Sequence, residues 1–320
     1  MLIYYDPLCL KHDTGAHPEN AGRLKPLEGR LDDWVVRWGA TRPKYAPATL
    51  DQLKLVHAAG YIDSIREACE AGGRRLDPDT VTSPMSYEAA RLASGAVVDA
   101  VTRVVGGEDR IAFCAVRPPG HHALRDRAMG FCLFNHVAVG AAVATRTLGL
   151  SRVLIVDWDV HHGNGTQAIF WEDPQVGFFS MHRYPFYPGS GAADETGAGA
   201  GAGMTRNLPI SFGTPPDKIM AMFRESLVEF AARVKPELVL ISAGFDAHRE
   251  DPIGSLGLET SHFRSLTEIV HPLAASHAGG RIVSVLEGGY NPAALTASIE
   301  THLQSMHELD GKYAGGSDSR

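Results

Sequence analysis

Residues 153–167 read VLIVDWDVHHGNGTQ and are the most informative segment for the architecture of the chain. It begins with a continuous apolar run, which is typical of a strand buried on both faces. Two carboxylates and two imidazoles follow within six positions, namely Asp157, Asp159, His161 and His162. Side chains alternate along an extended chain, so Asp157, Asp159 and His161 share one side of it. Because neighbouring carboxylates repel each other, the pattern predicts a cation beside them.

The rest of the chain repeats this apolar pattern between helix-like segments. Strands are expected at 110–116, 152–158, 237–245 and 281–287, and helices at 86–105, 135–149 and 216–234. Such alternation predicts an α/β fold with a mostly parallel central sheet and helices on both faces. No linker separates two halves, and the glycine-rich stretch 189–205 is expected to be a loop. We therefore expect a single domain over 1–309, followed by a frayed tail over 310–320.

Composition excludes several classes of protein. The net charge is −7 and the pI is about 6.1, so the chain lacks the basic field that direct nucleic-acid binding requires. No apolar run approaches the length of a membrane span, and no signal peptide is apparent. The four cysteines are widely spaced and form no CxxC pair. These features predict a cytoplasmic protein that contacts neither nucleic acid nor membrane.

Reactive side chains follow each predicted strand. The four segments are RPPGHH (117–122), DWDVHHGNG (157–165), FDAHREDP (245–252) and EGGY (287–290). Taken singly, each has a structural explanation, such as a helix N-cap, a packed histidine pair or a tight turn. Ligands of open α/β sheets bind at the carboxyl ends of the strands, where all four segments would meet. Together they predict one functional site.

In its motifs the chain resembles the zinc-dependent histone deacetylases and their bacterial relatives, which have the arginase/deacetylase fold. The resemblance extends from about residue 12 to 305. It rests on HPENAGRL (17–24), RPPGHHA (117–123), GFCLFNHVAVGA (130–141), DWDVHHGNGTQ (157–167), SMHRYPFYPGSG (180–191), SAGFDAHREDP (242–252) and LEGGY (286–290). The HPE start and Asn164 are similar to class II enzymes.

The resemblance implies a metal centre. Asp159, His161 and Asp246 match the three zinc ligands, which leave an open position for water and substrate. This oxygen-rich set also suits Fe(II), Mn(II) or Co(II). The match further implies structural potassium ions. One would be bound at Asp157, Ser180 and Met181, and a second at Phe170, Asp173 and Val176.

The same match implies how the reaction proceeds. His122 would be the general base and then the general acid, oriented by Asn164. His121, paired with Asp157, would stay protonated and stabilise negative charge. Tyr290 would donate a hydrogen bond to the tetrahedral oxyanion.

A substrate tunnel is implied as well. Phe131 and Tyr187 match the aromatic walls that flank an acyl-lysine side chain, and Gly130 would accept from the substrate amide. Asp79 is the candidate rim carboxylate. Ile253 occupies the position at which some polyamine deacetylases carry an acidic residue, so an internal ammonium would lack a partner there.

These implications predict a metal-dependent amidohydrolase that removes acyl groups, most simply acetyl, from lysine in proteins or peptides. The closest alternative is hydrolysis of acetylpolyamines or other small acetylated amines. An arginase-like manganese ureohydrolase and an inactive acyl-lysine-binding module are less favoured, because the chain has the histidine pair and tyrosine of the deacetylases. The sequence is compatible with a homo-oligomer as well as with a monomer.

Overall fold

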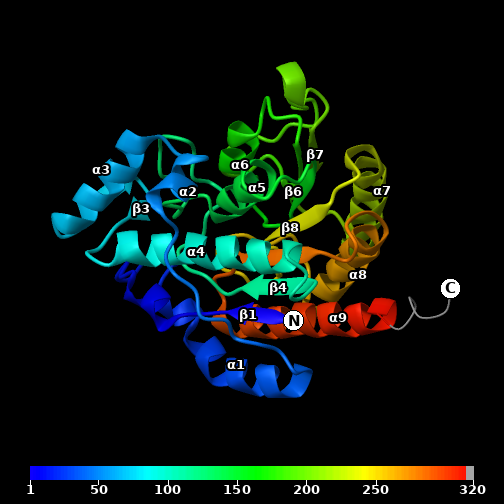
Figure 1. Cartoon of the computed structure of the whole chain (residues 1–320), viewed down its shortest axis with the longest axis horizontal. Coiled ribbons are helices and arrows are strands. Elements are labelled where there is room, and N and C mark those ends of the chain that lie inside the picture. Colours follow the sequence, from blue (N-terminus) through cyan, green and yellow to red (C-terminus); the bar gives the residue numbers. More distant parts are fainter. Residues whose placement is uncertain (315–320) are drawn as a thin grey trace.

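The computed structural model describes residues 1–314 and is built around one seven-stranded sheet (Figure 1). All strands of this sheet run parallel, in the order β1-β4-β9-β8-β5-β6-β7. The bounds are β1 Leu2–Tyr4, β4 Ile111–Cys114, β5 Val153–Asp157, β6 Val176–Arg183, β7 Thr205–Ile210, β8 Leu238–Ala243 and β9 Ile282–Leu286. A separate antiparallel pair joins β2 Arg75–Asp77 to β3 Thr80–Val81.

Helices cover both faces of the sheet. The α-helices are α1 Lys25–Trp38, α2 Leu50–Lys54, α3 Ala59–Glu70, α4 Ser86–Val105, α5 His136–Arg146, α6 Asn164–Ile169, α7 Pro216–Val234, α8 Thr260–His277 and α9 Pro292–Ala314. Short 3-10 helices span Pro7–Lys11, Ala21–Arg23 and Gly199–Gly201. Among the described residues, no helix is long and apolar enough to cross a membrane.

Two apolar cores result from the alternation of side chains along the strands. In β5, Leu154 and Val156 pack into the core beneath α1, α7, α8 and α9. Val153 and Ile155 point to the opposite core, which α3, α4 and α5 cover. A strand buried on both faces needs apolar residues at every position, which explains its continuous hydrophobic run.

The predicted fold class is confirmed: the molecule is a single domain with a parallel sheet between helices. The four predicted strands correspond to β4, β5, β8 and β9, and the three predicted helices to α4, α5 and α7. Strands β1, β6 and β7 were not predicted; β1 has only three residues. Of the expected frayed tail, residues 310–314 belong to α9, and 315–320 lie outside the described residues.

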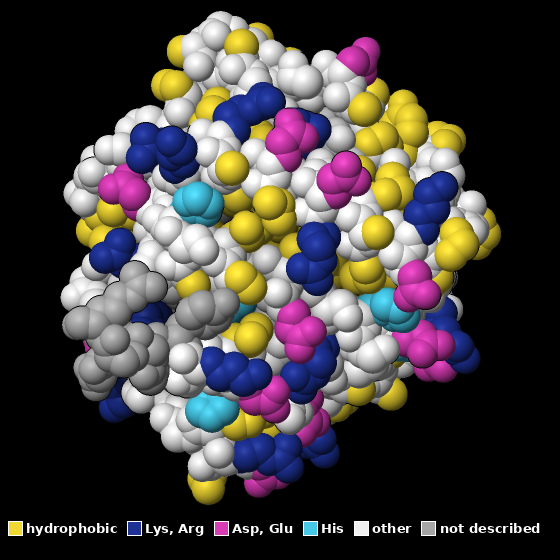
Figure 2. Space-filling view, turned by 90° about the vertical axis from the view of Figure 1, so that its right-hand side faces the viewer, with side chains coloured by type: hydrophobic (Ala, Val, Ile, Leu, Met, Phe, Trp, Pro, Cys, Tyr) yellow, Lys and Arg dark blue, Asp and Glu magenta, His cyan; other side chains and the backbone are white. Residues whose placement is uncertain are grey.

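The glycine-rich stretch 189–205 is a loop that ends in β7. The carboxylate of Glu195 accepts hydrogen bonds from the backbone of Gly191 and Ala192 and from the side chain of Gln167. These bonds fix the loop against α6. On the face drawn in Figure 2, acidic and basic side chains are intermixed over the surface.

Candidate active site

The three predicted metal ligands meet at the carboxyl ends of β5 and β8. His161 Nδ1 lies 3.0 Å from Asp159 Oδ1 and 3.1 Å from Asp246 Oδ2. All three side chains are buried. The segment after β5 thus turns two of its side chains toward the carboxylate that follows β8.

This arrangement fits a divalent metal. Ligand atoms of tetrahedral zinc, at bond lengths of about 2.0–2.1 Å, are separated by roughly 3.3 Å. A Cβ atom on Gly288 would lie 2.2 Å from Asp246 Oδ2, and one on Gly244 would lie 2.1 Å from Asp159 Oδ2. Glycines therefore leave room for the carboxylates to converge. Burial, followed by repulsion from Asp159, raises the pKa of Asp246 to about 7, and a cation at this point would relieve that repulsion.

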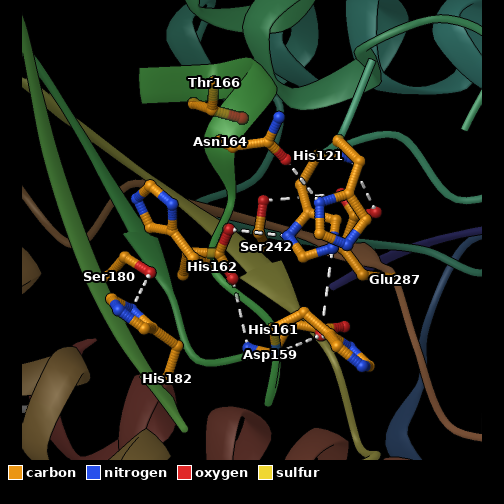
Figure 3. A network of polar contacts seen from close by, with 12 residues as sticks. His121, Asp159, His161, His162, Asn164, Thr166, Ser180, His182, Ser242 and Glu287 are labelled. Atoms are coloured by element: carbon orange, nitrogen blue, oxygen red, sulfur yellow. Dashed lines mark hydrogen bonds and ion pairs between the residues drawn. The ribbon is translucent and has the colours of Figure 1, made fainter. Parts of the chain in front are cut away.

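The histidine pair lies beside this group, with ring centroids 4.0 Å apart. Figure 3 shows His121 in the same network of polar contacts as Asp159 and His161. His121 Nδ1 is 2.9 Å from Asp157 Oδ2, and its Nε2 is 3.8 Å from Asp159 Oδ1. Burial lowers the pKa of His121, but these two carboxylates outweigh it and raise the pKa to about 10. His121 is therefore an imidazolium.

His122 has the opposite protonation state. Its Nδ1 donates to Asn164 Oδ1 at 2.7 Å, while the Asn164 amide donates to the sulfur of Met129. Burial, then the charges of His121 and His161, lower the pKa of His122 well below its ordinary value. With Nδ1 acting as the donor, Nε2 keeps its lone pair and can accept a proton.

Tyr290 follows β9 on a turn that several residues hold in place. Its backbone N–H donates to Asp251 Oδ2 at 2.7 Å. The guanidinium of Arg23 donates to the carbonyls of Gly289 and Glu287, each at 2.6 Å, and lies 4.8 Å from the centroid of the Tyr290 ring. Burial raises the pKa of Tyr290 well above its ordinary value, so the phenol stays protonated and can donate.

A buried carboxylate organises the N-terminal segment beneath this turn. Glu19 accepts from Arg117 Nε at 2.6 Å and from Arg23 Nη1 at 3.0 Å, and all three side chains are buried. Arg117 begins the segment that carries His121 and His122. Each charge has an opposite partner, which burial of ions requires.

The remaining predicted residues line a cavity of about 210 Å³ above the metal-ligand group. Its lining comprises Asp79, His122, Gly130, Phe131, His161, Phe186, Tyr187, Ile253 and Tyr290. The Phe131 ring meets Tyr290 edge-on at 5.7 Å, and Tyr187 meets His122 edge-on at 5.2 Å. The structure therefore brings together all five residues that were predicted for substrate binding.

The structure shows where the residues predicted for the two potassium sites lie. Asp157 and Ser180 are partners in the β5–β6 register, Met181 follows in β6, and Ser180 Oγ contacts His182 Nδ1 at 2.9 Å. The second group lies in the turn between α6 and β6. There Asp173 N donates to the Phe170 carbonyl at 3.0 Å, and Val176 begins β6.

Sequence reasoning gave no role to Phe186, Arg23, Glu19, Asp251 or Glu287. Phe186 stacks on the His161 ring at 5.3 Å with an interplanar angle of 15°. All five occur inside the quoted motifs, so their positions were visible. What the sequence lacked was a signal for their partners, because Arg23 and Gly289 are 266 residues apart.

The parallel sheet and this cavity define a site in which three side chains that could hold a metal lie beneath an aromatic-lined tunnel. Residues 17–306 match the histone deacetylase domain family. A histone deacetylase-like amidohydrolase from Pseudomonas aeruginosa is 37% identical over 313 residues, which cover 91% of this chain and 82% of that relative. Histone deacetylase 14, chloroplastic, from Arabidopsis thaliana is 35% identical over 322 residues, covering 95% and 76% respectively.

A solved structure agrees with these sequence relatives. The crystal structure of the HDA15 HD domain superposes with a TM-score of 0.90 at 37% identity, covering 96% of this chain and 88% of that one. The chain therefore belongs to the histone deacetylase family of hydrolases. The predicted arginase/deacetylase fold is confirmed.

Proposed function

We propose that this protein is a metal-dependent deacylase that hydrolyses the amide of acyl-lysine, most simply acetyl-lysine, in proteins or peptides. One observation supports this most strongly. A neutral histidine and a protonated tyrosine line one narrow cavity with aromatic walls, and the group of three candidate metal ligands reaches the same cavity through His161. An unreactive amide needs an activated nucleophile, a polarised carbonyl and a proton for the leaving amine, and these groups can supply all three.

Asp159, His161 and Asp246 would hold the metal, which we propose to be zinc. When bound, zinc supplies Lewis-acid polarisation of the amide carbonyl and eases ionisation of a water molecule. Asp157, Ser180 and Met181 are our candidate ligands for a structural potassium ion. Phe170, Asp173 and Val176 are the candidates for a second one.

In the proposed reaction, Nε2 of His122 accepts a proton from the attacking water. The water oxygen bonds to the carbonyl carbon, and the phenol of Tyr290 donates a hydrogen bond to the carbonyl oxygen as its negative charge develops. His122 then returns the proton to the amine nitrogen, and the carbon–nitrogen bond breaks. The second proton of the water also ends on the amine, so the products are a carboxylate and the lysine ammonium.

Two neighbouring side chains, Asn164 and His121, support this cycle. Asn164 holds His122 in the tautomer that leaves Nε2 free. His121, protonated beside Asp157, provides positive charge near the developing oxyanion without taking part in proton transfer.

The tunnel suits the alkyl stem of lysine. Phe131 and Tyr187 would flank the methylene groups, the carbonyl of Gly130 would accept from the substrate amide, and Asp79 would bind backbone amides at the rim. Ile253 gives the cavity an apolar side, on which an internal ammonium of a polyamine would find no partner.

Turnover of substrates tests this proposal directly. The zinc-loaded protein should be assayed against acyl-lysine peptides of several chain lengths and against acetylspermidine and acetylputrescine, with metal content measured on the same sample. We expect higher kcat/KM for the peptides. Faster turnover of every acetylpolyamine would identify a small-amide hydrolase instead.

The cellular site of action is a separate proposal. The four cysteines are buried, and free thiols suit a reducing compartment. We propose the cytoplasm, and fractionation of cells that produce the tagged protein would test this. Gel filtration with light scattering would determine whether it forms homo-oligomers.

A further inference from the structure

Glu287 is a buried carboxylate at the end of β9 that the proposed reaction does not use. Its side chain is 1% exposed. Oε2 accepts two backbone hydrogen bonds, from Gly120 at 2.6 Å and from His121 at 3.1 Å, and Oε1 lies 3.4 Å from Ser242 Oγ. Figure 3 shows Glu287 and Ser242 beside His121. One oxygen thus anchors the segment in which the histidine pair begins.

The backbone of Glu287 belongs to a different part of the site. Its carbonyl accepts from Arg23 at 2.6 Å, and its N–H donates to the carbonyl of Ala243 at 3.0 Å. The next residue, Gly288, donates its N–H to Asp159 Oδ2 at 2.8 Å. Tyr290 follows two residues later. Glu287 therefore links the segment of His121 and His122 to the turn that carries Tyr290. The same turn contacts the candidate metal ligand Asp159.

We infer that Glu287 is a positioning residue, whose carboxylate sets the distance of His121 and His122 from the metal ligands and from Tyr290. This inference rests on the proposed function. Proton transfer from water requires His122 Nε2 within hydrogen-bond reach, and a displacement of about 1 Å can cost about 100-fold in rate. On this inference, the hydrogen bonds from Gly120 and His121 restrain the segment against such a displacement.

Two conservative variants of Glu287 distinguish the effect of side-chain length from the effect of side-chain charge. In E287Q the amide oxygen can still accept from both backbone groups, and its NH₂ can face Ser242 Oγ, although the charge is lost. In E287D the charge remains, but the side chain is one methylene shorter and falls short of Gly120 and His121. A positioning role predicts a parent-like E287Q and an impaired E287D. An electrostatic role predicts the reverse order.

The variants should be compared with the parent as zinc-loaded proteins on one acetyl-lysine peptide. We expect kcat of E287D to fall about 10- to 100-fold with little change in KM, whereas E287Q retains the kcat of the parent. Hydrogen exchange of the peptide segment that contains Gly120 and His121 should be faster in E287D only. The matched control is S242A, which removes the weak contact to Oε1 and should leave both measurements unchanged.

A parent-like kcat and unchanged exchange in E287D would overturn the inference, as would an E287Q as impaired as E287D. If E287D does not fold, E287Q decides alone: parent-like kcat and exchange support positioning, and their loss overturns it. If the parent cleaves no acyl-lysine peptide, the proposed function fails. Hydrogen exchange would still show whether Glu287 holds the histidine segment.

Discussion

Replacement of Tyr290 by phenylalanine removes one oxygen from the floor of the tunnel. The contacts that fix the residue do not involve this oxygen. Its backbone N–H bonds to Asp251 at 2.7 Å, and its ring lies 4.8 Å from the Arg23 guanidinium and 5.7 Å from the Phe131 ring. We therefore expect Y290F to fold, bind metal and bind substrate much as the parent does.

The chemical step should slow considerably. In the proposed reaction the hydroxyl donates to an oxygen whose negative charge develops in the transition state, so its loss affects kcat more than KM. Removal of one oxyanion donor typically costs about 2.7–4 kcal/mol, or about 10²- to 10³-fold in kcat. The high pKa of Tyr290 keeps this donor protonated throughout the neutral range, so the loss should not depend on pH there.

Steady-state kinetics on an acetyl-lysine peptide, together with metal analysis and thermal unfolding, measure this effect. Tyr187 provides the matched control, because it lines the same cavity and is 36% exposed. Y187F loses a hydroxyl from the tunnel wall and should keep its kcat. If Y290F retained a near-normal kcat, Tyr290 would belong to the turn alone, and the oxyanion would need another donor.

Three further perturbations test other parts of the molecule. D246A should lose both bound metal and deacylation, and full activity of metal-stripped parent protein would refute a metal-dependent mechanism. I253E should shift the ratio of kcat/KM toward acetylpolyamines, because a carboxylate can pair with their ammonium; an unchanged ratio would remove Ile253 from the specificity determinants. Burial lowers the pKa of His57 to about 4, and its Nε2 accepts a hydrogen bond from Asn135 N. The His57 ring is therefore neutral in the folded state. The unfolded state then binds more protons at this site, so His57 should contribute a loss of up to about 3 kcal/mol to the urea-unfolding free energy as the pH falls from 6.5 to 4. This slope should be shallower in H57Q, and an equal slope would contradict the assignment.

Local patterns in the sequence predicted the centre of the sheet and the residues that follow its strands. The apolar run before Asp157 predicted the strand correctly. The structure also places Asp159 and His161 together, but through a bend at 159–161 after the end of the strand and not through alternation along it. Resemblance to a family then supplied Asp246, which is distant in the sequence. Strand β1 was not predicted, because a strand of three residues is too short to show a periodic pattern.

The supporting residues could not be predicted for a different reason. Nothing in the HPENAGRL motif indicates that Arg23 reaches the turn before Tyr290, or that Glu19 binds Arg117. Such pairs depend on how the sheet brings its strand ends and the N-terminal segment together. Sequence patterns identify which groups are reactive, whereas the three-dimensional fold determines which groups hold them.

Charge explains why two adjacent imidazoles differ. Of the buried carboxylates here, Asp157 pairs with His121, Glu287 binds the backbone of Gly120 and His121, and Asp159 and Asp246 belong to the group that we propose to hold the metal. A proton on His122 would add a charge with no partner, in a buried place beside His121. The Nδ1 atom of His122 bonds to the neutral side-chain carbonyl of Asn164, whereas Nδ1 of His121 bonds to the carboxylate of Asp157. The second histidine is therefore left neutral, as a general base must be at the start of the reaction.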